Sequence, residues 1–80
     1  MAASATLLDR ITTDPRLLAG KPVVRGLRIS VEQLLMALAA GQSEAELLHE
    51  YPELEPADFR AVLLFATEAV QEQRIYRLAT

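Results

Sequence analysis

Four prolines divide this chain and limit where its helices can lie. A proline ring pushes the residue before it out of the helical region, so a helix is not expected to run through that position. The four residues concerned are Asp14, Lys21, Tyr51 and Glu55. Each predicted helix therefore has to lie between these positions and cannot cross them.

Before Ser30 the residue pattern is typical of extended chain. The run from Ile11 to Thr13 is β-branched, and Leu27-Arg28-Ile29 alternates apolar and basic residues. We expect two short strands, about residues 10–13 and 26–30, that are able to pair; residues 23–24 could extend the second. Gly20 and Gly26 are assigned as structural turn residues, and a kink at 25–26 would suit a glycine with positive φ.

From Ser30 onward the apolar period is that of a helix. Ser30 with Gln33 forms a capping-box pattern, apolar residues recur on one face of residues 31–38, and Gly41 ends the segment. The first predicted helix covers residues 31–40, with Gly41 in the left-handed C-terminal position. Ser43 with Glu46 forms a second capping box, which predicts a short helix over 44–51.

Pro56 fits the first position of a third helix, which we expect to reach about residue 73. An apolar stripe runs along it: Phe59, Val62, Leu63, Ala66 and Val70. A second apolar surface contains Ala61, Leu64, Phe65 and Ala69. This surface indicates either a wide buried face or a subunit interface, and we predict a homodimer with Leu64 and Phe65 between the subunits.

Length and composition place these elements in one domain. The chain has 80 residues, 51% of them hydrophobic, and no cysteine. The predicted fold class is mainly α, a three-helix helix-turn-helix domain with a short N-terminal β element. We divide the chain into a flexible N-terminus (1–9), the domain (10–73) and a C-terminal tail (74–80). No signal peptide or membrane span is expected, so we predict a cytoplasmic location.

Charge is distributed unevenly. Residues 9–28 hold five Lys and Arg against two Asp, a net +3, whereas residues 30–80 hold three Arg against nine acids, a net −6. We select Lys21, Arg25 and Arg28 as DNA- or partner-binding residues; the alternative is a solvated strand edge. The third helix begins with acidic residues, so it is a poor reader of the major groove.

No residue pattern predicts catalysis. His49 is the sole histidine and lies among glutamates, which is more typical of a solvated helix face than of a metal site. Ser30 and Ser43 are explained as helix caps, and no phosphate-binding glycine loop is present. We expect no enzyme activity, no metal and no cofactor.

Several runs of residues resemble a known family. They are Ile11 to Pro15, Gly20 to Ile29, Gly41 to Pro52 and Leu54 to Asp58. Together they closely resemble the domain-of-unknown-function family 433, over about residues 10–72. The resemblance implies a small homeodomain-like helical protein with short N-terminal strands, similar to VapB-type antitoxins.

The resemblance further implies that such a protein neutralises a PIN-like ribonuclease toxin and binds its own promoter DNA as a dimer. Two alternatives stay open. One is a protein-interaction module without DNA binding, and the other is a stand-alone transcriptional regulator. These alternatives give opposite roles to Arg25 and Arg28, which would contact either phosphates or acids of a partner protein.

Overall fold

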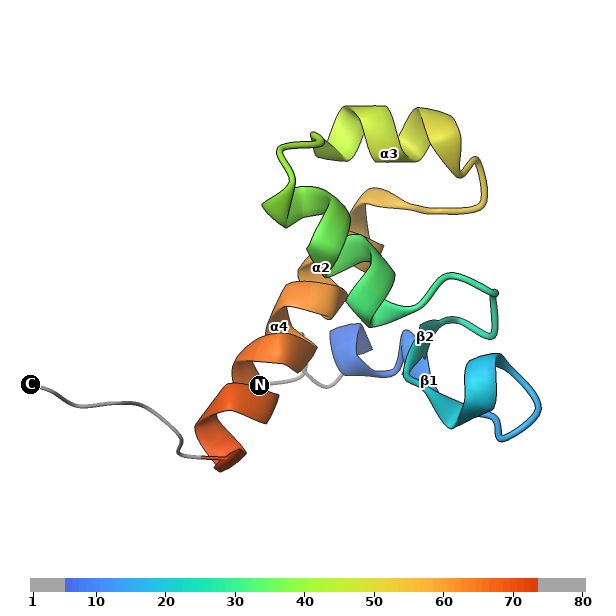
Figure 1. Cartoon of the computed structure of the whole chain (residues 1–80), viewed down its shortest axis with the longest axis vertical. Helices are drawn as coiled ribbons and strands as arrows, with labels where there is room; N and C mark the ends of the chain where they lie inside the picture. Colours follow the sequence, from blue (N-terminus) through green and yellow to red (C-terminus); the bar gives the residue numbers. More distant parts are fainter. Residues whose placement is uncertain (1–5, 74–80) are drawn as a thin grey trace, which may run out of the picture.

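The computed structural model describes residues 6–73. Three helices dominate it: α2 (Val31–Ala39), α3 (Glu44–Glu50) and α4 (Pro56–Gln73) (Figure 1). Strands β1 (Ile11–Thr12) and β2 (Val23–Val24) pair antiparallel, with Ile11 opposite Val24. The fold is therefore mainly helical with a short N-terminal β element, as predicted. The predicted C-terminal tail lies outside the described residues, and residues 6–8 of the predicted flexible N-terminus form a turn of helix.

The second strand does not lie at residues 26–30, where the sequence pattern placed it. Strand β2 ends in a tight turn, in which the Leu27 N–H donates to the Val24 carbonyl at 2.8 Å. The two central residues, Arg25 and Gly26, have φ values of +45° and +73°, as a type I′ turn requires. The chain then folds back, and only Ser30 forms a β-bridge, to Val23. The alternation of residues 27–29 was therefore not a strand signal.

A second left-handed segment precedes β2. The short 3-10 turn η1 (Leu18–Gly20) has positive φ at all three residues, +47°, +59° and +82°. For the first two, Leu18 and Ala19, this conformation costs roughly 1–2 kcal/mol each. Gly20 was a predicted turn residue, but no local signal in the sequence indicates the positive φ of its two neighbours.

Local signals place the helix boundaries well. The Gly41 N–H donates to the Leu38 carbonyl and the Gln42 N–H to the Ala37 carbonyl, which together form a Schellman motif with Gly41 at φ +99°. The Ser43–Glu46 capping box is complete. The first capping box is only half formed, because Gln33 donates its N–H to Ser30 but its side chain to the Tyr51 hydroxyl at 2.9 Å.

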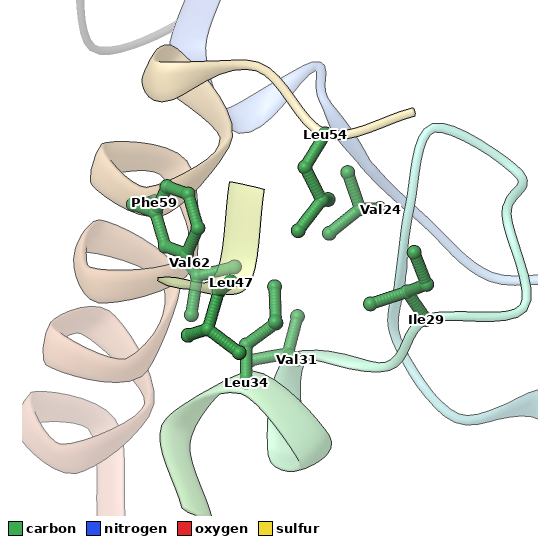
Figure 2. Close-up of a cluster of buried hydrophobic side chains, with 8 residues drawn as sticks. All are labelled: Val24, Ile29, Val31, Leu34, Leu47, Leu54, Phe59 and Val62. Atoms are coloured by element: carbon green, nitrogen blue, oxygen red, sulfur yellow. The ribbon is translucent and has the colours of Figure 1, made fainter. Parts of the chain in front are cut away.

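The core lies where the N-terminal half of α4 meets α2, α3 and the turn that follows β2 (Figure 2). Its members are Val24, Ile29, Val31, Leu34, Leu47, Leu54, Phe59 and Val62. Only part of the predicted α4 stripe belongs to it, since Leu63 and Val70 are 45% and 54% exposed, whereas Ala61, expected outside the stripe, is buried. The reason is that α4 continues past the other two helices (Figure 1). Phe65 still packs against the core, but the turns after it extend beyond the core.

Candidate functional site

Arg25, one of the predicted contact residues, is only partly exposed and is paired with Asp58 of the same chain. The Asp58 side chain is fully buried at the start of α4. Arg25 donates to both carboxylate oxygens, from Nε at 3.1 Å and from Nη2 at 2.9 Å, and Nη2 also donates to the Glu53 carbonyl at 2.6 Å. This forked geometry is the strong form of an arginine–carboxylate pair. It fixes the β2 turn against the beginning of α4.

Two further donors complete the surroundings of Asp58. Arg10 Nη1 lies 2.9 Å from Asp58 and 2.8 Å from the Glu55 carboxylate, and the Glu55 backbone N–H donates to Asp58 at 2.8 Å. Burial alone would raise the pKa of Asp58, but the hydrogen bonds from Arg25, Glu55 and Arg10 outweigh it and lower the pKa below its ordinary value of 3.8. The carboxylate therefore stays ionised, and the cluster acts as an internal clamp.

The other two predicted contact residues differ from each other. Lys21 Nζ pairs with Glu32 at 2.9 Å, and both side chains are more than half exposed. Arg28 is exposed and has no hydrogen bond or ion pair with any residue in the described part of the chain. Of the three cations, Arg28 is thus the one whose charge is not already offset within residues 6–73.

An apolar groove lies between α2 and the second half of α4. Its volume is about 370 Å³. The residues around it are Lys21, Pro22, Val31, Glu32, Leu35, Met36, Phe65, Ala66, Ala69 and Val70. The Lys21–Glu32 ion pair is the only charged feature of this lining, and Met36 and Val70 on its walls are 65% and 54% exposed. The groove thus presents large apolar side chains to solvent.

A second hollow of about 350 Å³ follows α4 and is lined by Leu63, Ala66, Thr67, Val70 and Gln71. We call this surface the α4 flank. The predicted interface residues Leu64 and Phe65 are both half-buried within one chain, and Phe65 packs against the core. The α4 flank therefore offers more exposed apolar surface than these two residues do.

The sequence analysis did not predict the groove or the exposure of Met36 on its wall. A signal was present, because Leu35 and Met36 follow Leu34 and make the apolar arc of α2 wider than one core face needs. Which part of that arc is exposed depends on where α4 crosses α2, and this is a tertiary property.

The exposed surface of α3 is acidic, with Glu44, Glu46 and Glu50.

The described helices include none long and apolar enough to cross a membrane. Within residues 6–73, no three His, Asp or Glu side chains lie close enough together to hold a metal ion.

Comparison with known proteins gives the family. The model of a protein family of unknown function (DUF433) matches residues 11–66, from β1 to the middle of α4. The chain is 36% identical over 62 residues to the uncharacterized protein y4eO of Sinorhizobium fredii, an alignment that covers 78% of this chain and 28% of y4eO. The chain thus spans little more than a quarter of that relative's length. No solved structure matches. The family match includes Arg25, Asp58 and most of the groove lining, and the chain belongs to the DUF433 family.

Proposed function

We propose that this chain is a protein-binding module that acts as the antitoxin of a PIN-like ribonuclease, with the groove between α2 and α4 as its docking surface. The proposal rests on two apolar side chains, Met36 and Val70, which line this apolar groove and are exposed to solvent. Exposed apolar patches of this kind mark interaction sites, and a groove between two helices suits one face of a partner helix. The kind of partner follows from the resemblance to VapB-type antitoxins.

Promoter binding by a dimer is the second activity that the resemblance implies. The distribution of charged residues supports DNA binding less well than the groove supports protein binding. Lys21 and Arg25 would have to release Glu32 and Asp58 before they could neutralise phosphates. The surface of α3 is acidic, so it would repel the DNA backbone. Of Lys21, Arg25 and Arg28, only Arg28 has no ion pair with residues 6–73 and is free to contact that backbone. We therefore place protein binding first, and the proposal gives the chain no catalytic role.

Co-expression with a PIN-like ribonuclease from the neighbouring reading frame tests the proposal. Val70→Glu and Met36→Glu place a charge in the groove at exposed positions, so both variants should remain folded. We expect each to weaken inhibition of RNA cleavage by about tenfold or more, the effect of damaging an interface centre. Ala45→Glu, on the exposed surface of α3, is the matched control and should inhibit as the parent does.

The opposite result has a definite meaning. Unchanged inhibition by both groove variants would contradict the docking surface. A gel shift with upstream DNA, run in parallel on Arg28→Ala, addresses the regulator alternative. Loss of DNA binding in Arg28→Ala, with no effect of any variant on the nuclease, would identify the chain as a stand-alone regulator.

A further inference from the structure

Two of the large apolar side chains that the fold leaves exposed lie on the α4 flank. Within residues 6–73 the exposed side chains of this kind are Met36, Leu63 and Val70, and the last two line the flank. We propose that a second copy of the chain covers the flank, with the two α4 helices antiparallel and Leu63 of each copy against Val70 of the other. This inference concerns self-association and does not depend on the partner proposed above.

The order of residues along the flank suits two copies related by two-fold symmetry. Four of the residues that line it share one face of the helix, because they recur at intervals of three and four positions. They are Leu63, Ala66, Thr67 and Val70. The two large side chains stand at the ends of this set and the two small ones in the middle, so the order is the same in both directions. In an antiparallel pair, Leu63 therefore meets Val70 of the other copy. Ala66 meets Thr67 in the same way, and these small side chains let the two helices approach closely.

The flank also has the shape that such a pair needs. In a two-fold contact each copy presents the same residues to the other, so one surface has to supply both an exposed side chain and a space that receives it. Val70 is exposed and lines a hollow of about 350 Å³, whose other lining residues include Ala66 and Thr67. The hollow of each copy can thus receive the second copy's Val70 beside Leu63.

Charge favours the flank over the groove and α3 as the place where two copies meet. Residues 6–73 hold six Lys and Arg against eleven Asp and Glu, a net −5, so two copies repel each other. None of the residues that line the flank is charged. The groove has Lys21 and Glu32 in its lining, and the exposed surface of α3 is acidic. Two flanks therefore approach each other without bringing like charges together.

The contact is small. It covers about two turns of helix, at ~3.6 residues per turn. Stable interfaces bury roughly 1,200–2,000 Å² in total, which is more than two helical turns on each copy supply. We therefore expect a weak pair that dissociates on dilution.

Sedimentation equilibrium of the full chain over a range of concentrations tests for the pair. We expect the mean mass to rise from that of one chain towards that of two, and Val70→Glu to need a concentration about tenfold or more higher to reach the same mass. Met36→Glu is the matched control, because Met36 is exposed and lines the groove but not the flank. This variant should associate as the parent does. Circular dichroism of each variant checks that the fold is retained.

Disulfide cross-linking tests the antiparallel arrangement. The chain has no cysteine, so each single-cysteine variant reports on one position. In the proposed pair the two copies of position 63 are about 10 Å apart along the helix axis, from the rise of ~1.5 Å per residue between 63 and 70. That exceeds the Cα–Cα distance of about 7 Å that a disulfide can bridge. On oxidation, a mixture of Leu63→Cys and Val70→Cys should therefore cross-link between the two variants, whereas neither variant should cross-link alone.

Four results would overturn the proposal. A parent chain that is monomeric at every concentration would remove the contact. Loss of association in Met36→Glu, with Val70→Glu unaffected, would place the second copy in the groove. Cross-linking of Leu63→Cys to itself in preference to Val70→Cys would mean that the helices are parallel. The absence of any cross-link in a mixture that still associates would mean that α4 does not pair in this register. The nuclease test stays separate, because Met36→Glu changes the groove and not the flank.

Discussion

At the scale of single residues, Asp58 connects the N-terminal segment, through Arg10 and Arg25, to the first turn of α4. Its buried carboxylate accepts four hydrogen bonds, two of them from Arg25. A buried charge is tolerated only when it is paired in this way. The same contacts hold Arg25 at a positive φ, which a non-glycine residue adopts only when its surroundings enforce it.

We predict that Asp58→Ala destabilises the protein by about 2–4 kcal/mol, because it removes the carboxylate that accepts from Arg10, from Arg25 and from the Glu55 N–H. Urea denaturation followed by circular dichroism measures this free energy of unfolding. Glu53→Ala is the control: it removes one carboxylate from the same region but keeps the backbone carbonyl that Arg25 uses. Equal losses in both variants would mean that only net charge matters.

The lowered pKa of Asp58 predicts the direction of the pH dependence. Because the folded state favours the ionised form, the stabilisation is complete above the unfolded pKa of about 4 and is lost as pH falls through the lower folded value. The free energy of unfolding should therefore fall between about pH 5 and pH 2. The hydrogen bond from Arg16 also lowers the pKa of Asp14, so this carboxylate contributes to the same loss of stability at low pH. Asp58→Asn should flatten the curve, and an equally steep acid limb in this variant would contradict the assignment.

At the scale of elements, the helices and the first strand were predictable, whereas the second strand was not. Serine caps, Gly41 and Pro56 act on residues within one turn of themselves, so helices α2, α3 and α4 lie within a residue or so of their expected bounds. Strand β2 depends on the Arg25-Gly26 turn and on pairing with β1, which are contacts between distant residues. The candidate site has the same limit: charge counting identified Arg25, but its partner Asp58 is 33 residues away.

Ser43 is expected to matter because α3 has only seven residues. We predict that Ser43→Ala lowers the free energy of unfolding by about 1 kcal/mol, since the Glu46 N–H loses its acceptor. Ser43→Asn supplies another good cap and should be nearly neutral. Thermal melts of the two variants distinguish a capping effect from simple loss of a hydroxyl, which would affect both equally.

At the scale of the whole molecule, α4 is longer than the core it covers. Its second half leaves Leu63 and Val70 exposed, and a domain of this size gains stability by association. We therefore keep the homodimer as a proposal and take the α4 flank, rather than Leu64 and Phe65, as the surface more available to a second copy.

We predict that Leu63→Glu gives a folded monomer, whereas Phe65→Glu unfolds the chain, because Phe65 packs against the core and Leu63 does not. Light scattering reports the mass and circular dichroism the fold. Leu64→Glu is the discriminating variant: if it alone abolishes a dimer, the interface lies on the face of α4 that the sequence first indicated. A parent chain that is monomeric throughout would remove the dimer from the proposal.

The clamp between Arg25 and Asp58 also bears on the order in which the molecule assembles. Closing a long loop costs more entropy than forming a cap or a helical turn, so the helices should form before the N-terminal hairpin docks. During synthesis, the residues up to Ser30 leave the ribosome well before the start of α4. The hairpin therefore has to wait, with its apolar residues Val23 and Val24 uncovered, until Asp58 has emerged and can anchor it.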